Sequence, residues 1–311
     1  MSVEARSYGP LRISEIGFGA WVLGDMYGRL GRDEARRLVG KALDLGINFF
    51  DVADVYGSGK AEQLLGELLA GAEGVVVATK VGYDFYAGGR PRRRYDREYV
   101  EVALRRSVER LGRIPDLIQL HNPTAAEIRE SSYFLGLRGV YGRFVGVALG
   151  PEVDVLEEGL AALQMGYDSI MFVFNILEQQ PGLQLIEAGR GRMLLARVPH
   201  ASEVLTDRFR PRFPGEDHRS LRRPEWLARA REIVEREVAP LARELGYTLG
   251  QYALKFVLSF PITSVLVTAT SVDELEEYAA ASDGRPLPRE HLEALLSIPA
   301  KYGAELKALE R

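Results

Sequence analysis

The chain has 311 residues, of which 46% are hydrophobic and 27% charged, with a formal net charge of -4 and no cysteine. This is the composition of an ordinary globular protein, and the small negative charge provides no broad basic face for nucleic acid. The absence of cysteine excludes disulfide bonds, a thiolate nucleophile and a thiolate zinc site.

The first ten residues, MSVEARSYGP, lack the apolar stretch of a signal peptide, and no later apolar run approaches the roughly eighteen residues of a membrane span. We therefore expect a cytoplasmic protein with no membrane or nucleic-acid partner. Only six of the 40 basic residues are lysine. An arginine-rich surface is typical of thermostable proteins, although genomic base composition produces the same bias.

In chain order, short runs of β-branched residues alternate with amphipathic stretches of helix length, which is the pattern of parallel strands joined by crossover helices. The predicted strands are Ile16–Ala20, Asn48–Asp51, Val75–Lys80, Asp116–His121, Arg143–Leu149, Ser169–Phe174, Met193–Val198 and Ser264–Val267. The predicted helices are Arg32–Leu45, Ala61–Leu69, Arg97–Leu111, Ala125–Leu135, Val153–Leu163, Gly182–Ala188, Glu225–Leu245, Leu249–Leu258 and Val272–Ala281. Gly46, Gly112 and Gly246 follow three of these helices and are placed for left-handed caps.

Eight parallel strands around one core close into a barrel, whereas an open doubly wound sheet needs a glycine-rich phosphate turn after its first strand. No G-x-G-x-x-G is present, and the glycines of segment 17–21 do not run into a helix. We therefore predict an α/β fold, a (β/α)8 TIM barrel with an N-terminal hairpin and extra C-terminal helices, in which residues 1–311 form a single domain. The irregular segment His200–Pro224 is predicted to lie over the barrel mouth, because a stretch of this length usually covers a binding site.

Three reactive side chains end consecutive predicted strands: Asp51 ends INFFD, Lys80 ends VVVATK and His121 ends LIQLH. In a barrel these ends meet at one rim, where active sites lie. Tyr56, in the loop after Asp51, can fold back over the same mouth. A nearby ammonium lowers the pKa of a phenol from its ordinary value of about 10 toward working pH. A carboxylate in turn keeps a buried lysine charged. Together the four residues form a proton-donating device.

Taken alone, each residue also has an ordinary structural explanation. Asp51 or its neighbour Asp54 can cap a loop or the next helix. Lys80 can reach solvent along its alkyl chain. His121 and Tyr56 can simply pack with one polar atom in water. The combination of all four at one rim, rather than any single residue, favours the catalytic interpretation.

The residues around this rim resemble the aldo-keto reductase family. Residues 46–57, GINFFDVADVYG, followed by AEQLLG, are similar to that family's most characteristic signature. Residues 107–112, SVERLG, followed by DLIQLH, are similar to its second signature. The similarity extends from Ile16 to Glu277 and so covers nearly the whole chain.

The resemblance implies that the catalytic tetrad consists of Asp51, Tyr56, Lys80 and His121. Tyr56 is then the general acid, Lys80 lowers its pKa and Asp51 is the counter-ion of the lysine. His121 orients or polarises the substrate carbonyl. The implied reaction is reduction of an aldehyde or ketone, in which a reduced nicotinamide supplies hydride and Tyr56 supplies the proton.

The resemblance also implies an apolar substrate pocket. Trp21 stands at the position of the family's pocket tryptophan. Tyr83, Phe85 and Tyr86 are expected to supply further walls, or else to pack as loop aromatics.

The cofactor half of the chain departs from the family pattern. Ala148 and Leu149 replace the Ser-Asn pair that holds the nicotinamide carboxamide, and Met171 stands where a glutamine is expected. Arg197 replaces the ring that stacks on nicotinamide. Glu274 takes the position of an Arg or Gln that binds the 2′-phosphate of NADP, and a carboxylate there repels that group.

Near the carboxyl end, residues 265–271 align with the family's phosphate loop but lack its Pro and Gly, although backbone amides at the next helix start can still receive a phosphate. Glu277 keeps the acidic residue of the adenine contact, and Tyr278 replaces an Asn. The cofactor-binding residues that the resemblance implies are Gly19, Trp21, Asp51, Ala148, Met171, Arg197, Thr268, Ala269, Thr270, Ser271, Glu274, Glu277 and Tyr278.

These departures permit remodelled NADP(H) binding, a change to NAD(H), or a barrel that keeps its tetrad without turnover. NADP(H) is the expected cofactor, with NAD(H) as the alternative because of Glu274. Arginines of the irregular segment either form a different phosphate clamp or a solvated basic loop. They are Arg208, Arg210, Arg212 and Arg219.

Other classes of function stay open. Lys80 could serve as the Schiff-base nucleophile of a lyase, although Asp51 argues for a protonated lysine. The barrel could also be a sensor that binds a dinucleotide with little or no turnover. A metal hydrolase built from Asp51, Asp54 and His121 is a poor fit, because the remaining histidines lie in loops or the tail. These are His200, His218 and His291.

Overall fold

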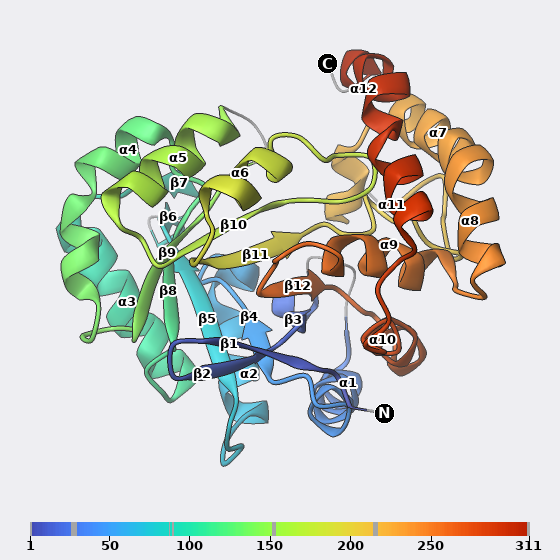
Figure 1. Ribbon diagram of the computed structural model, residues 1–311. Coiled ribbons are helices and arrows are strands. Elements are labelled where there is room, and N and C mark those ends of the chain that lie inside the picture. Colours follow the sequence, from blue (N-terminus) through green and yellow to red (C-terminus); the bar gives the residue numbers. More distant parts are fainter. Residues whose placement is uncertain are drawn as a thin grey trace.

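The computed structural model describes residues 2–25, 30–86, 88, 90–150, 154–213 and 217–309. Its centre is a closed barrel of eight parallel strands, with helices around the outside (Figure 1). Around the barrel the strands are β3 (Ile16–Gly19), β4 (Phe49–Asp51), β5 (Val76–Val81), β8 (Leu117–His121), β9 (Phe144–Ala148), β10 (Ser169–Val173), β11 (Met193–Arg197) and β12 (Ser264–Val267). The predicted (β/α)8 barrel is therefore confirmed, and each strand was predicted to within one residue at either end.

The other elements surround or extend this barrel. Two small antiparallel pairs are β1 (Ala5–Tyr8) with β2 (Leu11–Ser14) and β6 (Tyr83–Asp84) with β7 (Arg92–Arg93). The α-helices are α1 (Arg32–Asp44), α2 (Lys60–Leu68), α3 (Arg97–Leu111), α4 (Ala125–Glu130), α5 (Val155–Met165), α6 (Gly182–Ala188), α7 (Pro224–Ile233), α8 (Ala239–Glu244), α9 (Leu249–Leu258), α10 (Val272–Ala279), α11 (Arg289–Leu296) and α12 (Ile298–Leu309). Short turns of other helix types are η1 (Ala20–Gly24), η2 (Tyr56–Gly59), η3 (Ser132–Leu137), η4 (His218–Leu221) and η5 (Val234–Val238). The β1–β2 pair is the predicted N-terminal hairpin, and α11 and α12 are the predicted C-terminal helices.

Two predicted helices differ from the observed elements. The stretch Glu225–Leu245 is divided into α7, a π-helical turn η5 and α8. Pro240 lies in the first turn of α8 and cannot donate a backbone hydrogen bond, so the wider turn before it accommodates the missing bond. The stretch Ala125–Leu135 ends as an α-helix at Glu130 and continues as the tighter turn η3. Val153, the predicted start of α5, lies outside the described residues.

Alternate residues of each strand point toward the barrel axis, because side chains of a strand alternate between its two faces. The interior is filled by an apolar cluster that includes Phe49, Ala78 and Leu195. Ile13 of the N-terminal hairpin belongs to the same cluster, so the hairpin closes the amino-terminal end of the barrel. A packed floor therefore leaves the carboxyl-terminal end as the open mouth.

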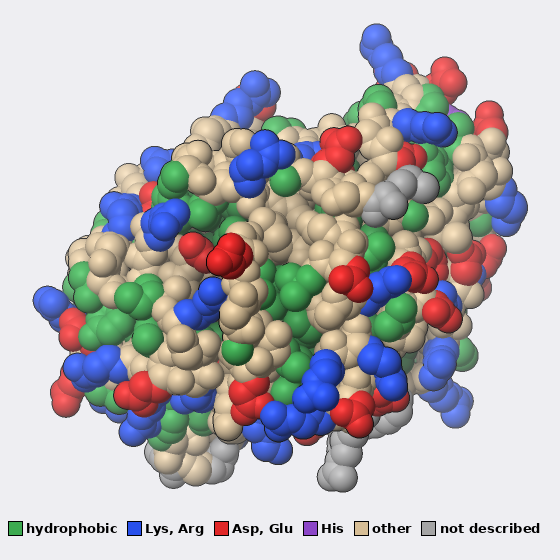
Figure 2. Space-filling view, turned by 90° about the horizontal axis from the view of Figure 1, so that it is seen from below, with side chains coloured by type: hydrophobic (Ala, Val, Ile, Leu, Met, Phe, Trp, Pro, Cys, Tyr) green, Lys and Arg blue, Asp and Glu red, His purple; other side chains and the backbone are tan. Residues whose placement is uncertain are grey.

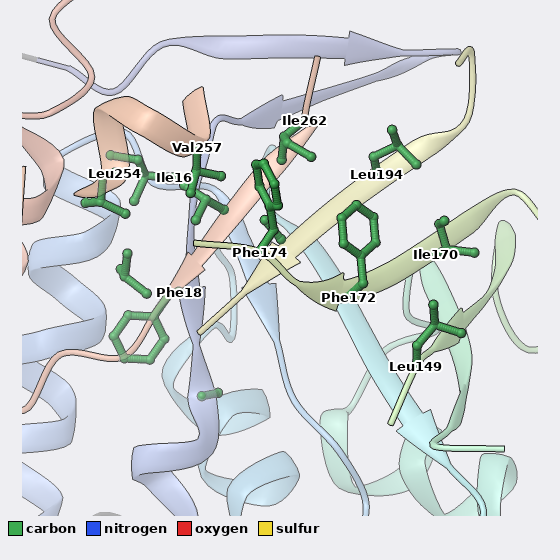
Figure 3. Close-up of a cluster of buried hydrophobic side chains, with 14 of the residues drawn as sticks. Ile16, Phe18, Leu149, Ile170, Phe172, Phe174, Leu194, Leu254, Val257 and Ile262 are labelled. Carbon is green, nitrogen blue, oxygen red and sulfur yellow. The ribbon is translucent and has the colours of Figure 1, made fainter. Parts of the chain in front are cut away.

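The outward-facing strand residues form a larger cluster with the surrounding helices. Phe18, Phe172 and Leu194 leave their strands on this side, and Leu254 and Val257 of α9 belong to the same cluster (Figure 3). All five are almost fully buried. Burial of such a side chain stabilises the fold by about 1.5–3 kcal/mol, so the helix layer holds the strands in a fixed register.

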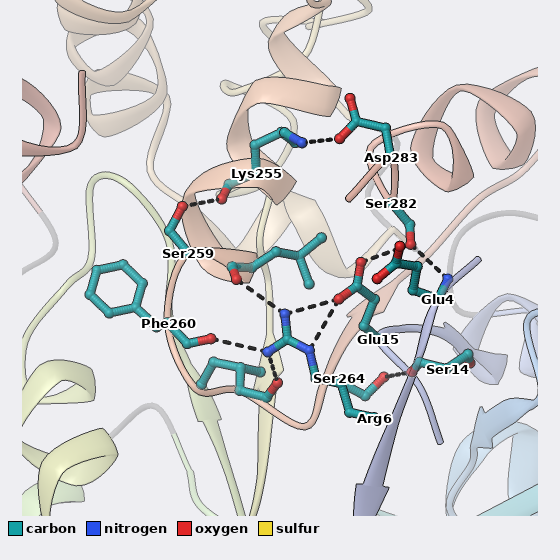
Figure 4. Close-up of polar contacts among 12 residues, drawn as sticks. Glu4, Arg6, Ser14, Glu15, Lys255, Ser259, Phe260, Ser264, Ser282 and Asp283 are labelled. Carbon is teal, nitrogen blue, oxygen red and sulfur yellow. Dashed lines mark hydrogen bonds and ion pairs between the residues drawn. The ribbon is translucent and has the colours of Figure 1, made fainter. Parts of the chain in front are cut away.

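A polar network ties the hairpin to the amino-terminal end of the barrel (Figure 4). Arg6 of β1 donates to the backbone carbonyls of Leu258, Phe260 and Ile262, which follow from the end of α9. The same guanidinium pairs with Glu15 at 2.9 Å, and Glu15 accepts a hydrogen bond from Ser282. Arg6 thus satisfies the last carbonyl of α9, at Leu258, and two carbonyls of the loop that connects α9 to β12.

Charged side chains of both signs are interspersed on the face drawn in Figure 2. Many charged side chains of the described residues form ion pairs, such as Arg229 with Glu305 at 2.7 Å. None of the described helices is long and apolar enough to span a bilayer.

Candidate active site

The polar residues of the mouth continue the inward-facing positions of the strands. Asp51 follows the inward Phe49 by two residues, Lys80 follows Ala78 and Arg197 follows Leu195. His121, at the end of β8, lies opposite Ala148 in the register. The alternation that buries apolar side chains lower in the barrel therefore brings these polar groups into its mouth.

Lys80 lies at the centre of the predicted tetrad. Its Nζ donates to Asp51 Oδ2 at 2.5 Å, to the Val52 carbonyl at 2.9 Å and to the Tyr56 hydroxyl at 3.3 Å. Gln119 donates to the other oxygen of Asp51 at 3.3 Å. These contacts use the three protons of the ammonium and fix its direction.

The charge of Lys80 is maintained by its neighbours. Burial opposes the charged form, but Asp51 and Tyr56 outweigh burial and raise the pKa of Lys80 above its usual value. Lys80 is therefore an ammonium at neutral pH and not a free amine.

Tyr56 reaches the mouth from η2, immediately before α2. Its ring stacks on Trp21 with 5.0 Å between centroids and meets the ring of His121 edge-on, with 5.8 Å between those centroids. Burial raises the pKa of Tyr56 above its usual value, although Lys80 and Arg197 act in the opposite direction. The expectation of a lowered pKa is therefore wrong for the free protein. Lys80 lowers the pKa of Tyr56 as expected, but burial, which is the largest effect, and the charge of Asp51 together raise it by more. The phenol keeps its proton and is poised as a donor.

His121 is neutral in this environment. Burial, followed by the charges of Lys80 and Arg197, lowers the pKa of His121 well below its usual value. Among the described residues, its buried Nδ1 has no hydrogen-bond partner. Tyr95 fixes the backbone by donating to the His121 carbonyl at 2.6 Å. A neutral imidazole can donate one N–H to a substrate oxygen without competing with Tyr56 for a proton.

These pKa shifts predict the pH dependence of any reaction in which Tyr56 donates a proton beside a neutral His121. Because the pKa of Tyr56 is raised, its proton is retained as pH increases; because the pKa of His121 is lowered, its ring stays neutral as pH decreases through 6.5. We therefore expect kcat/KM to be constant between about pH 6 and about pH 9. Steady-state assays across this range test the prediction, with tryptophan emission as a control for the fold. An inflection near neutral pH would contradict the assigned protonation states.

The tetrad forms the base of a cavity of about 800 Å³ at the barrel mouth. This volume lies within the usual range of sites for small molecules and cofactors. The cavity is lined by all four tetrad residues. The predicted cofactor residues that line it are Gly19, Trp21, Asp51, Ala148, Met171, Arg197, Thr268, Thr270, Glu274 and Tyr278.

Six other predicted site residues lie away from this lining. Ala269 is fully buried, and Ser271 caps α10 by accepting from the amide of Glu274 at 3.2 Å. Glu277 pairs with Arg208 at 2.8 Å and accepts from Thr248. The remaining three are the predicted pocket aromatics Tyr83, Phe85 and Tyr86.

Those aromatics form a separate group beside the mouth. Tyr83 meets the edge of His121 at 5.1 Å between centroids, and its hydroxyl accepts from Asn122 at 3.2 Å. Phe85 and Tyr86 pack on each other at 4.2 Å, and the Tyr86 hydroxyl accepts from Arg110. Tyr83 therefore contacts His121 from outside the cavity lining, whereas Phe85 and Tyr86 pack with each other.

Where the cavity reaches α10, Glu274 interacts with its own loop. Its carboxylate accepts from the Thr270 amide at 2.6 Å and from the Thr270 hydroxyl at 2.9 Å. The carboxylate of Glu274 thus accepts the hydrogen bond of a backbone amide just before α10. This is the loop that was expected to bind a phosphate. Nearby, Tyr278 packs on His200 at 4.3 Å, and burial lowers the pKa of His200 to about 4.

The irregular segment contributes side chains to the cavity. His200, Ala201, Ser202 and Glu203 line it, as does Arg219 of η4. Arg219 pairs with Glu203 and with Asp217, so its charge is already matched by carboxylates. Arg210 and Arg212 are exposed and do not line the cavity. Residues 214–216 lie outside the described part of this segment.

The candidate metal ligands are spread out. Asp54 is fully buried, and burial, followed by the charge of Glu62, raises its pKa well above the usual value. His291 lies in α11, where its Nδ1 is 2.9 Å from the Tyr252 hydroxyl, and His218 begins η4. No three His, Asp or Glu side chains gather into a metal site within the described ranges.

The sequence analysis missed several residues of the cavity. Asn122, Gln179, Arg222 and Arg223 all line it. Asn122 directly follows His121, so its place after a strand-end residue of the predicted tetrad was a usable signal. Arg222 and Arg223 lie in the irregular segment that was predicted to cover the mouth, but the sequence did not indicate which of its side chains enter the cavity. Gln179 lies in the loop after β10, for which the sequence contained no signal.

The family model described as the aldo/keto reductase family matches residues 15–299. An uncharacterized oxidoreductase, YqkF, of Bacillus subtilis is 30% identical over 302 residues, covering 92% of this chain and 93% of its own. The solved structure of aldo-keto reductase AKR11C1 from Bacillus halodurans in its holo form superimposes with a TM-score of 0.78 at 27% identity, covering 95% of this chain and 96% of that one. The glycerol dehydrogenase AKR11B4 of Gluconobacter oxydans gives the same TM-score at 25% identity, covering 97% and 96%. The chain therefore belongs to the aldo/keto reductase family.

Proposed function

We propose that the protein reduces aldehyde or ketone carbonyls to alcohols with a nicotinamide cofactor, and that Tyr56 is the general acid. The family and the oxidoreductases among its relatives support carbonyl reduction in general. The observation that carries the assignment to this site is the contact of Lys80 Nζ with both Asp51 and Tyr56 at the base of a large cavity.

Each tetrad residue has a distinct task in this proposal. The bound cofactor supplies the hydride to the carbonyl carbon. Tyr56 donates its phenolic proton to the carbonyl oxygen, and the ammonium of Lys80 stabilises the phenolate that remains. Asp51 keeps Lys80 charged, and neutral His121 orients the same oxygen through a ring N–H.

The cavity fits the nicotinamide end of such a cofactor. Buried Arg197 Nε, Asn122 Oδ1 and Gln179 Oε1 belong to cavity-lining side chains and have no hydrogen-bond partner among the described residues. One free donor and two free acceptors suit the carboxamide of a nicotinamide ring, which has a carbonyl oxygen to accept and an NH2 group to donate. Arg197 and Asn122 would lie at this end, while Thr268 and Thr270 line the cavity toward α10.

The contacts of Glu274 favour NAD(H) over NADP(H). Its carboxylate already accepts from the Thr270 amide and hydroxyl, and a 2′-phosphate brought to it would be repelled. The proposal thus takes up the alternative cofactor that Glu274 already suggested in the sequence, whereas NADP(H) was the expected one.

We expect the unmodified protein to bind NADH more tightly than NADPH, and Glu274→Gln to strengthen NADPH binding by about tenfold because one adjacent charge is removed. Quenching of Trp21 emission and calorimetry with each dinucleotide measure both affinities. Ser271→Ala, which removes the cap of the same helix but no charge, is the control. Equal NADPH affinity in the Glu274→Gln and unmodified proteins would contradict this role, and failure of both dinucleotides to bind would contradict the proposed function.

The contacts of Lys80 also bear on the lyase alternative. A Schiff base requires a free amine, whereas Lys80 is a hydrogen-bonded ammonium. Borohydride trapping of a carbonyl compound on Lys80 would favour the lyase over the proposed hydride transfer.

A further inference from the structure

The formal charges at the base of the cavity leave one cation without a counter-ion. Lys80 is balanced by Asp51, while Tyr56 and His121 are neutral. Arg197 forms no ion pair within the part of the chain that the structure describes, and its Nε is buried without a partner. A guanidinium stays protonated in proteins. The base of the cavity therefore carries a net positive charge that belongs to Arg197.

Arg197 places this charge across the mouth. Its inward side chain leaves the end of β11, and Nη2 donates to the carbonyl of Leu149 at 2.8 Å, directly after β9. Because β10 lies between β9 and β11 in the barrel, the side chain of Arg197 crosses over the end of β10. The charge of Arg197 contributes to lowering the pKa of Asp51, of Tyr56 and of His121, so all three groups lie within its electrostatic reach.

The chemistry of hydride transfer brings the nicotinamide ring close to this charge. If Tyr56 donates a hydrogen bond to the carbonyl oxygen of a substrate, the carbonyl carbon lies about 1.2 Å from that oxygen. The nicotinamide carbon that gives up the hydride must approach this carbonyl carbon to about 3–3.5 Å. The ring must therefore lie in the same base of the cavity as Tyr56. The oxidised ring carries a positive charge and the reduced ring carries none, so a fixed cation there repels only the oxidised form.

We propose that Arg197 makes this site selective for the reduced form of its cofactor, by holding an unpaired guanidinium against the position of the nicotinamide ring. This inference rests on the proposed function and adds a residue that sets the balance between the two redox states. In carbonyl reduction the oxidised cofactor is the product that must leave. Arg197 therefore weakens product binding, and the same repulsion adds to the cost of hydride transfer from the bound ring.

The test is the ratio of dissociation constants for the oxidised and reduced forms, measured by calorimetry without substrate. We expect the unmodified protein to bind NAD+ about tenfold to a hundredfold more weakly than NADH. A neighbouring like charge that solvent does not screen changes the equilibrium constant for forming a second charge by about this factor, as it does for a pKa. The neutral variants Arg197→Met and Arg197→Gln should reduce the ratio toward one, mainly by tighter binding of NAD+. Arg197→Lys keeps the charge and should keep most of the ratio. NADPH and NADP+ serve as a second pair.

Lys307→Met is the matched control. Lys307 of α12 lines the same cavity but is exposed, and it has no ion pair within the described ranges. Water and salt screen such a charge, so its loss should leave the ratio unchanged.

Three outcomes would overturn the inference. They are an unchanged ratio in both neutral variants, a ratio that falls as much in Arg197→Lys as in Arg197→Met, and a ratio that falls equally in Lys307→Met. Each leaves the proposed function intact, because the cofactor still binds. Absence of binding by either reduced dinucleotide overturns the proposed function together with the inference.

Discussion

Replacing Tyr56 with phenylalanine is expected to lower kcat/KM for carbonyl reduction by at least about 10²–10⁴-fold, the usual contribution of a positioned general acid. The variant loses the hydroxyl that Lys80 contacts at 3.3 Å, and with it the proton for the carbonyl oxygen. The ring itself stays in place because it stacks on Trp21. NADH binding, measured by quenching of Trp21 emission, should therefore be nearly unchanged.

The control is Tyr247→Phe, which removes a hydroxyl that donates to Asp283 at 2.7 Å and lies outside the cavity lining. Its rate should equal that of the unmodified protein. Turnover by Tyr56→Phe at a normal rate would show that another group donates the proton. Loss of both turnover and cofactor binding would point instead to a structural role for the hydroxyl.

Replacing Lys80 with methionine is expected to lower the free energy of unfolding by about 3–5 kcal/mol and to abolish turnover. Lys80 and Asp51 are both almost fully buried and are joined at 2.5 Å. Removal of the ammonium leaves the carboxylate of Asp51 in the barrel with only the weaker contact from Gln119. Denaturant titrations measure the loss of stability, and steady-state assays measure the loss of rate.

The double variant Asp51→Asn with Lys80→Met separates stability from catalysis. It removes both buried charges at nearly constant volume, so much of the lost stability should return while activity stays absent. If Lys80→Met alone were as stable as the unmodified protein, the ion pair would not be buried as described. If the double variant recovered activity, Lys80 would not be the group that assists Tyr56.

The convergence of Asp51, Lys80 and His121 could be predicted because it follows from local patterns. Each lies at or next to the carboxyl end of a strand, each faces inward by the two-residue alternation, and consecutive strands of the barrel are neighbours. The spacing along the chain therefore specified the rim on which these side chains meet.

The protonation state of Tyr56 could not be predicted in the same way. The sequence placed a cation beside the phenol and suggested a lowered pKa. The structure adds burial and the carboxylate of Asp51, both of which favour the neutral phenol and outweigh Lys80. Similarly, the resemblance implied that Phe85 and Tyr86 either wall the pocket or pack as loop aromatics, and the structure shows the second, because the two rings pack with each other beside the cavity.

By itself, the sequence determined the barrel, the order of its strands and the identity of the side chains at its mouth, since alternation and turn signals are properties of short segments. Only the tertiary structure decided which of those side chains are already engaged. Glu274 accepts from Thr270, whereas Arg197 reaches the Leu149 carbonyl without a carboxylate partner in the described chain. The physical reason is that charge balance, burial and pKa depend on distances between segments far apart along the chain, and these distances are fixed only when the barrel closes.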